Sequence, residues 1–400
     1  MNPLKKIYCR IVHFAFRMAK PLLPYTQPKI LNAIEEIPSV LKEKNIFSVL
    51  LVTDAFLKKS GMSAPLEKLL EDEGIVCTVY DKTQPNPTVD NVKEATKLYR
   101  AKGCQGIIAL GGGSAMDCAK ATGACIARPK KTLQELKGVL RVRKKIPTLI
   151  AIPTTAGTGS EVTLAAVITD PQTKHKYPIN DFVLIPSYAV LDPKLTYTLP
   201  PSLTATTGMD ALTHAVEAYI GNSTTKKTRA HALEATRLIF ANIEKAYNDG
   251  EDYVARKNML RAAYLAGEAF SISYVGYVHA VAHPLGGQYN IPHGLANSIL
   301  LPIVLEAYGD VIHRKLHDLA NAAGLASVSD SDAEAAKRFI QAIYDMNARM
   351  NIPVTLEGIK KEDIPLMAAH ADKEGNPLYP VPVLMDAKEL EQFYYKVAKN

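Results

Sequence analysis

The chain has 400 residues, 47% of them hydrophobic and 22% charged, so it can bury a substantial core as two domains or one large one. The five cysteines form no Cys-x-x-Cys pair, which argues against a disulfide framework or a thiolate zinc site and favours a reducing cytoplasm. The net charge is +7, but six basic residues precede the first acidic residue, Glu35, so the remainder lacks the basic stripe of a nucleic-acid binder.

Residues 1–30 are predicted to form a basic amphipathic extension. The segment MNPLKKIYCRIVHFAFRMAKPLLP mixes apolar side chains with bases and contains no acid. This pattern is typical of an interfacial helix or a targeting peptide, and also of a helix docked on the protein's own surface, which we favour. Arg10 and Arg17 interrupt the apolar run, which disfavours a secretory signal. No uncharged apolar run reaches the roughly 18 residues that predict a membrane span.

Residues 31–197 alternate short apolar runs with helical stretches. This pattern predicts an α/β domain with a parallel sheet and crossover helices. Helices are expected over residues 64–74 and 88–103. The strand candidates are residues 46–53, 74–80, 106–110 and 148–154, with further strand and loop material before residue 197.

A glycine run, Gly111, Gly112 and Gly113 followed by Ser114, comes directly after one apolar strand and opens a helical segment. Such glycines let the backbone approach a diphosphate, and the amides and dipole of a helix N-terminus attract its charge. The run is not G-x-G-x-x-G, so the usual dinucleotide fingerprint is absent and a purely structural turn stays open.

Two further features favour a nucleotide at this end of the sheet. The hydroxyl-rich loop of residues 154–160 follows a buried strand and can cradle phosphate or ribose oxygens. Asp54, at the carboxyl end of the first predicted strand, can accept hydrogen bonds from an adenosine ribose and repel a 2′-phosphate. Asp54 therefore favours NAD over NADP, although the residue is equally a candidate helix N-cap and could fill both roles.

After Leu199 the pattern changes to long segments with helical apolar spacing and few strand-like runs. We place a domain boundary near residue 198 and predict that residues 198–400 form an all-α domain.

This second half carries the most informative spacing. Asp210 and His214 are four residues apart on one helical face, about 6 Å along the axis. His279 and His283 repeat that spacing, and His293 lies in a predicted Pro-His-Gly turn. A carboxylate with three imidazoles suits zinc or ferrous iron, with a position left for a substrate oxygen. Spacing alone does not select the ligands among four imidazoles and one carboxylate, and each histidine could be structural.

Four motifs together resemble the iron-containing (group III) alcohol dehydrogenases: GGGSAMD, PTTAGTGSEVT, GMDALTHAVEAY and HAVAHPLGGQYNIPHGLAN. The likeness runs from about residue 30 to the end. It implies the dehydroquinate synthase-like fold, with a Rossmann-like dinucleotide-binding domain, a helical metal-binding domain, and cofactor and metal between them. It also implies NAD(H)-linked, metal-dependent interconversion of small primary alcohols and their aldehydes.

The resemblance assigns Asp210, His214, His279 and His293 as metal ligands and favours Fe²⁺, with Zn²⁺ as the alternative. It places His283 beside the nicotinamide, where this imidazole is a candidate for relaying the hydroxyl proton. The cofactor contacts that it implies are Asp54, Asn86, Gly111, Gly112, Gly113, Ser114, Asp117, Thr154, Thr155, Thr158 and Lys176.

The sequence departs from the family at Ile272 and Tyr274, where many relatives carry an asparagine and smaller residues. This segment borders the substrate pocket in such enzymes, so a bulkier and less polar wall favours unfunctionalised substrates. Association as a homodimer or larger homo-oligomer is expected, because a strand near the amino terminus could pair across a two-fold axis.

Two alternatives stay open. The first is another enzyme of the same superfamily, such as a glycerol or polyol dehydrogenase or a cyclase. The second is a catalytically silent protein that binds NAD or a metal. Activity with simple alcohols separates these hypotheses from an alcohol dehydrogenase.

Overall fold

The computed structural model describes residues 1–20, 23–171 and 175–399. The chain divides into two compact units, one of Pro24–Thr198 and one of Leu199–Asn400 together with Met1–Leu23. We call them the sheet unit and the helical unit. The predicted boundary near residue 198 lies beside this division, and the first 23 residues belong with the helical unit.

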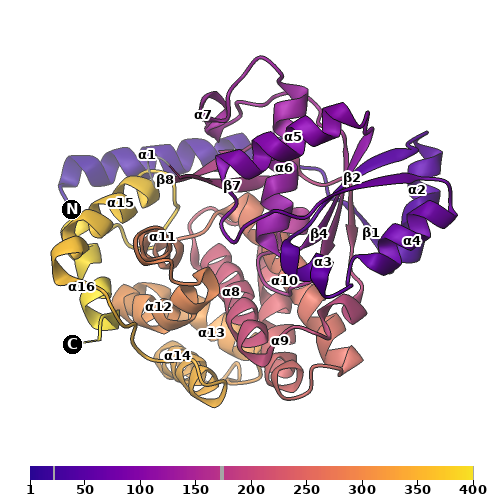
Figure 1. Ribbon diagram of the computed structural model, residues 1–400. Helices are drawn as coiled ribbons and strands as arrows, with labels where there is room; N and C mark the ends of the chain where they lie inside the picture. Colours follow the sequence, from indigo (N-terminus) through magenta and orange to yellow (C-terminus); the bar gives the residue numbers. More distant parts are fainter. Residues whose placement is uncertain (21–22, 172–174, 400) are drawn as a thin grey trace. The chain divides into compact units, whose positions relative to one another are not determined.

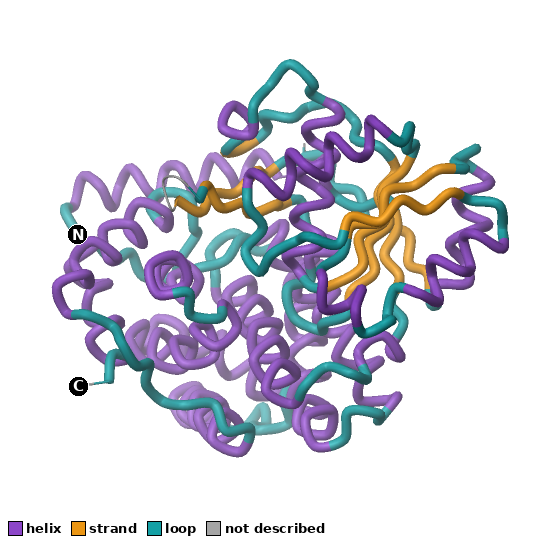
Figure 2. The backbone as a smooth tube through the Cα atoms, in the orientation of Figure 1, coloured by secondary structure: helices purple, strands orange, loops and turns teal. Residues whose placement is uncertain are grey.

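The sheet unit is built on a six-stranded parallel sheet with the strand order β1-β9-β6-β4-β2-β3 (Figures 1 and 2). The four predicted strands are present within one or two residues of their expected bounds. The three-residue strand β1 was not predicted, because so short a strand carries no alternation signal. The strands are β1 Lys29–Leu31, β2 Ser48–Val52, β3 Val76–Tyr80, β4 Gly106–Gly111, β6 Thr148–Pro153 and β9 Tyr188–Val190.

Helices cover both faces of this sheet (Figure 1). Along β2, Leu50 and Val52 belong to one buried apolar cluster, and Val49 and Leu51 belong to the other. Because both faces are buried, the strands are continuous apolar runs rather than alternating ones. The helices are α2 Ile37–Glu43 and α4 Ala64–Asp72 on one face and α5 Val89–Ala101 and α6 Gly113–Ala127 on the other.

The strand order reverses between β2 and β4. After β3 the chain passes back across β2 to form β4 on its other side. In open α/β sheets, ligands bind outside the carboxyl ends of the strands at such a reversal. Residues that directly follow β2 and β4 are therefore the expected nucleotide contacts.

A smaller three-stranded sheet, ordered β5-β8-β7, completes the sheet unit. Its strands are β5 Gly138–Val139, β7 Ala165–Asp170 and β8 His175–Asn180, with β7 antiparallel to β8. Short helical segments are α3 Ala55–Lys59, α7 Leu133–Leu136 and the 3-10 turns Ile34–Glu36, Ser160–Val162, Phe182–Leu184 and Pro193–Thr196.

The helical unit confirms the expected all-α character of the second half. Its helices are α1 Pro3–Ala19, α8 Pro201–Ile220, α9 Lys226–Asn248, α10 Tyr253–Ser273, α11 Tyr277–Tyr289, α12 His293–Tyr308, α13 His313–Ala322, α14 Asp332–Arg349, α15 Ile364–Gly375 and α16 Ala387–Val397, with 3-10 turns at Gly309–Ile312 and Lys361–Asp363. Helix α8 packs against α9, α10 and α12, so its side chains are buried on nearly every side.

One helical segment among the described residues, 293–322, has the length and composition of a membrane span. However, 67% of its most apolar window is buried within the protein, as expected for a core helix. A turn at Gly309–Ile312 also separates α12 from α13.

Candidate functional site

Helix α8 carries three ionisable side chains into the core of the helical unit. Asp210, His214 and Glu217 follow one another at intervals of four and three residues, so they share one helical face. All three are buried, with relative exposures of 2%, 4% and 3%. Burying ionisable groups is costly unless they are paired, so each of them needs a partner nearby.

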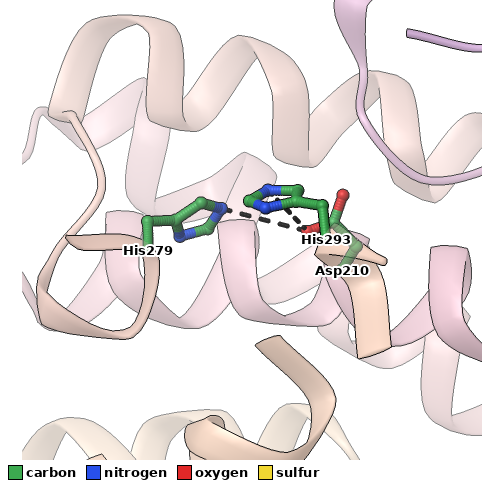
Figure 3. A group of neighbouring side chains, drawn as sticks. All are labelled: Asp210, His279 and His293. Atoms are coloured by element: carbon green, nitrogen blue, oxygen red, sulfur yellow. Dashed lines mark ion pairs between the residues drawn. The ribbon is translucent and has the colours of Figure 1, made fainter. Parts of the chain in front are cut away.

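Asp210, His279 and His293 come together from three helices, α8, α11 and α12. One potential ligand atom from each lies within 4.8 Å of the other two. Asp210 Oδ1 is 3.9 Å from His279 Nε2 and 3.6 Å from His293 Nε2. Figure 3 shows the two imidazoles turned toward the carboxylate. His293 is the first residue of α12, so the prediction of a turn there was wrong; a glycine after the first helical residue does not prevent a helix.

The fourth predicted ligand, His214, lies beside this group rather than within it. Its ring stacks on Phe270 at 4.1 Å and on His279 at 4.6 Å between centroids. The structure thus brings three predicted ligands together and places the fourth against one of them.

Glu217 fixes the orientation of His279. Its Oε2 lies 2.6 Å from His279 Nδ1, and its Oε1 accepts the backbone N–H of Val278 at 2.7 Å. With Nδ1–H donated to the carboxylate, the lone pair of Nε2 points toward Asp210. Gly276 makes room for this arrangement, because a Cβ there would lie 2.7 Å from Glu217 Oε1.

The side-chain amide of Asn297 contacts all three converging groups. Its Nδ2 lies 2.7 Å from Asp210 Oδ1, 3.3 Å from His279 Nε2 and 3.2 Å from His293 Nε2. One amide group therefore faces three electron-pair donors. One carboxylate oxygen and two imidazole nitrogens are ligands that suit a divalent ion of borderline softness, so the residues present fit such a metal.

The electrostatics of Asp210 agree with a cation-binding role. Burial alone would raise the pKa of this carboxyl group. The imidazoles of His214, His293 and His279 and the Asn297 amide outweigh that effect and lower the pKa to about 2. Asp210 is therefore a carboxylate at neutral pH, as a metal ligand must be.

His283 has its own carboxylate partner. Its Nδ1 lies 2.6 Å from Oε1 of Glu374, at the end of α15, and the Tyr379 hydroxyl donates to the same oxygen at 2.6 Å. Burial alone would raise the pKa of Glu374, but His283 and Tyr379 lower it. The ring of His283 stacks on that of His293 at 5.2 Å. The predicted catalytic histidine therefore adjoins the metal-ligand group.

Sequence reasoning missed Glu217, Asn297 and Glu374. Two of them had a local signal: Glu217 is the third member of the α8 face, and Asn297 lies one turn after His293. Glu374 is 91 residues from its partner His283, so no local spacing could have indicated it.

In the sheet unit, Asp54 and the glycine run lie together where the strand order reverses. Asp54 follows β2 and caps α3, with Oδ1 accepting the Leu57 N–H at 2.9 Å. A Cβ on Gly111, at the end of β4, would lie 3.9 Å from Asp54 Oδ2. The N-cap role that the sequence left open is present, and the second carboxylate oxygen faces the glycine run.

The loop of residues 154–160 packs against the same run. Thr154 N–H donates to the Gly111 carbonyl at 3.1 Å. A Cβ on Gly113 would lie 2.9 Å from Thr158 Cγ2, which is too close, and a Cβ on Gly112 would lie 3.4 Å from Thr155. Helix α6 starts at Gly113 without a side-chain cap on its N-terminal amides. The result is the glycine turn and helix N-terminus that suit a diphosphate.

Asn86 joins this edge from the loop after β3. Its N–H donates to Ser114 Oγ at 3.3 Å, and its Oδ1 accepts from Lys176 Nζ at 2.9 Å. All three were predicted as cofactor contacts, and they form one connected group.

Both carboxylate oxygens of Asp117, a predicted cofactor contact, accept hydrogen bonds from the protein itself. Its Oδ1 accepts from Ser160 Oγ and its Oδ2 from the Val167 N–H, each at 3.1 Å. Burial raises the pKa of Asp117, although the neighbouring Lys120 ammonium opposes that rise. Asp117 thus holds the loop of residues 154–160 against α6.

Tyr274, where the sequence departs from the family, ends α10 with an unusual backbone. Its φ of 67° with ψ of 173° is a conformation that favours glycine. Its ring lies 6.0 Å from that of Phe16 in α1, and burial raises the pKa of its hydroxyl. The bulky side chain is half-buried and packs against α1 within the helical unit.

The sheet unit has a glycine turn where its strand order reverses, and the helical unit has a buried carboxylate–imidazole group. These two features suit a protein that binds a dinucleotide and a divalent metal. Two family models match the chain: "Iron-containing alcohol dehydrogenase" over residues 30–193 and "Fe-containing alcohol dehydrogenase family, C-terminal" over residues 204–397.

Known proteins agree with the two models. The chain is 41% identical to "Alcohol dehydrogenase 4" of Saccharomyces cerevisiae (strain YJM789), over 85% of this chain and 88% of that protein. It is 38% identical to "NAD-dependent methanol dehydrogenase" of Bacillus methanolicus, over 85% and 90%. Among solved structures, 1,3-propanediol oxidoreductase superposes with a TM-score of 0.89 at 36% identity, over 94% of this chain and 99% of that one. The chain belongs to the iron-containing alcohol dehydrogenase family, and this membership implies NAD and a divalent metal.

Proposed function

We propose that this chain is an NAD(H)-linked, metal-dependent alcohol dehydrogenase and aldehyde reductase for small primary alcohols and their aldehydes. The observation that carries the proposal is the convergence of Asp210, His279 and His293 within 4.8 Å, with His279 oriented by Glu217. Neither open alternative explains this geometry better. A silent protein has no need of a carboxylate that orients a ligand histidine.

The ion would be held by Asp210, His214, His279 and His293, with Fe²⁺ favoured by the family and Zn²⁺ as the alternative. When bound, the metal supplies Lewis-acid polarisation of the substrate oxygen, and the nicotinamide supplies or accepts the hydride. Glu217 accepts a hydrogen bond from His279 Nδ1–H. This bond would keep the Nε2 lone pair of His279 directed at the ion. His214, whose ring stacks on that of His279, would contribute the fourth ligand.

The dinucleotide would bind at the carboxyl edge of the sheet. Its contacts would be Asp54, Asn86, the run from Gly111 to Ser114, Asp117, Thr154, Thr155, Thr158 and Lys176. Asp54 favours NAD over NADP, because its Oδ2 lies beside the glycine run, where a ribose hydroxyl can donate to it and a 2′-phosphate is repelled.

We propose that His283 moves the proton of the substrate hydroxyl. Glu374 accepts from its Nδ1, which leaves Nε2 as the atom that exchanges protons. The Tyr379 hydroxyl donates to the same Glu374 oxygen and so fixes the carboxylate that orients the ring.

His283→Ala is expected to slow turnover about 100-fold and to change its pH profile, since a positioned general acid or base contributes at least about that factor. Steady-state alcohol oxidation from pH 6 to 10 measures both effects. A variant that is slower but keeps the wild-type pH profile would show that His283 only shapes the pocket. Glu374→Gln serves as the comparison, because it keeps the ring in place and removes the charge.

The substrate is expected to be unfunctionalised. By the family resemblance, Ile272 and Tyr274 border the substrate pocket, where many relatives carry an asparagine and smaller residues. This wall would leave less room and fewer hydrogen-bond partners for a second hydroxyl. Relatives named 1,3-propanediol dehydrogenase, at 38% identity, and lactaldehyde reductase, at 36%, are named for substrates with a second oxygen function. The NAD-dependent methanol dehydrogenase, at 38%, is named for a simple alcohol, so the family spans both substrate types.

The test of the proposed function is anaerobic purification, elemental analysis, and oxidation of NADH or NADPH with a series of short aldehydes. We expect about one iron or zinc per chain, faster turnover with NADH, and butyraldehyde or propionaldehyde preferred over lactaldehyde. Faster oxidation of glycerol than of 1-propanol would favour a polyol dehydrogenase. Metal-loaded protein that binds NADH tightly and reduces no aldehyde would favour the silent alternative.

We further propose a cytoplasmic homodimer. The five cysteines are free thiols, as a reducing compartment maintains. Strand β1 lies at the edge of the six-stranded sheet, where its second side can pair with the same strand of another copy.

A further inference from the structure

Helix α1 presents two different sides. On one side Cys9 and His13 are buried against the helical unit. Basic side chains also point inward and anchor the helix. Lys5 Nζ bonds to Asp372 Oδ2 at 2.7 Å, and Arg10 donates to the carbonyls of Val381 at 2.8 Å and Pro382 at 2.7 Å. The favoured prediction, a helix docked on the protein's own surface, describes only this side.

The other side of α1 is apolar and exposed. Six large side chains here have relative exposures of 57% to 76%: Leu4, Ile7, Tyr8, Ile11, Phe14 and Met18. We call them the outward face. Spacings of three and four residues place most of them in one stripe. Among the described residues, 20 large apolar side chains are exposed, and six of them lie on this one helix, which is a patch rather than scatter.

Positive charge borders the outward face and no negative charge balances it on α1. Lys6 and Arg17 are eleven residues apart, about three helical turns, so they lie on the same flank of the stripe. Lys6 and Arg17 are exposed. The first acidic residue of the chain, Glu35, comes well after the helix ends at Ala19. An apolar stripe with a basic flank matches the surface of a bilayer that contains anionic lipids.

We propose that α1 is a peripheral membrane-binding helix, whose outward face enters the interfacial layer of an anionic phospholipid bilayer with Lys6 and Arg17 among the headgroups. A second copy of the chain fits less well, because two α1 helices face to face would bring like charges together without an acid between them.

This role does not depend on the proposed dehydrogenase activity. Helix α1 lies outside both matched family models, which begin at residues 30 and 204. The outward face is exposed without any rearrangement of the helical unit, and the inward contacts of Lys5 and Arg10 keep the helix in place while it binds.

The test is co-sedimentation of the full-length protein with vesicles of phosphatidylcholine alone or mixed with phosphatidylglycerol. We expect binding to the anionic vesicles that weakens with salt, and little binding to the neutral ones. Ile11→Asp with Phe14→Asp, and separately Lys6→Glu with Arg17→Glu, should each weaken binding about tenfold or more. Val328→Asp, at an exposed valine elsewhere, should bind as the wild type does.

Because all of these side chains are exposed, the variants should keep the melting temperature and the vesicle-free activity of the wild type. Absence of wild-type binding to anionic vesicles would overturn the proposal, as would undiminished binding by Ile11→Asp with Phe14→Asp. A wild-type dimer that dissociates in that variant, with no vesicle binding, would assign the outward face to a second copy instead.

Discussion

Glu217→Gln is expected to weaken metal binding roughly 10- to 100-fold, the usual cost of removing a carboxylate that orients a ligand histidine. The carboxylate accepts from both His279 Nδ1 and the Val278 N–H. Glutamine has the same shape but only one oxygen, so one of these donors must face an NH₂ group. The His279 ring then loses the partner that directs its Nε2 toward Asp210.

The measurement is competition for Zn²⁺ with a chromophoric chelator, which reports metal affinity independently of turnover. His279→Ala, which removes the ligand itself, defines the full loss, and Glu217→Gln should fall between it and the wild type. Glu244→Gln is the matched control, because Glu244 pairs with Arg349 on the surface. Wild-type affinity in Glu217→Gln would show that the carboxylate only fills space.

Lys120→Met is expected to destabilise the sheet unit by about 3 kcal/mol, the lower end of the range for breaking a buried charge network. Lys120 is fully buried in α6. Its ammonium donates to Ser160 Oγ at 3.0 Å and to the Thr163 and Ala165 carbonyls at 2.9 Å. Methionine fills a similar volume and leaves these acceptors, and the nearby Asp117 carboxyl, without their cation.

The stability that Lys120→Met loses relative to the wild type should increase with pH. Burial lowers the pKa of Lys120 from 10.5 to about 8, against the opposing effect of Asp117 and Glu161. The unfolded chain therefore binds more protons than the folded one between these values, so wild-type stability gains as pH rises from 8 to 10.5. Lys120→Met lacks this gain.

Melting temperatures at pH 8 and pH 10 test both parts of this prediction. The difference between wild type and Lys120→Met should be larger at the higher pH. The exposed Lys130→Met controls for the loss of a surface ammonium. Equal melting temperatures for Lys120→Met and wild type at both pH values would show that the loop of residues 154–160 does not need the Lys120 amino group.

Much of the fold could be predicted from the sequence, because buried segments have a recognisable pattern of apolar residues. Strands β2, β4 and β6 are covered on both faces, so each is a continuous apolar run that can be recognised locally. The six-stranded order was not readable, since it depends on pairing between distant segments. Strand β1 has only three residues, and its pairing with β9 comes from the far end of the sheet unit.

The candidate site, too, could be predicted from the sequence only in part. Asp210, His214 and Glu217 share one helix, so spacing alone places them on one face. Spacing does not indicate that His279 and His293 lie beside Asp210; only the family resemblance or the structure does. Glu374 and the backbone of Tyr274 had no sequence signal, because one depends on a distant helix and the other on a φ of 67° that no local pattern marks in a tyrosine.

The Asn297 amide has a consequence for how the site obtains its metal. This amide donates to Asp210 Oδ1 and faces both imidazoles, so an ion held by these side chains would take the place of one hydrogen-bond donor. A set of one carboxylate oxygen and imidazole nitrogens discriminates little between iron and zinc. The metal found in the purified protein should accordingly follow the supply in the growth medium.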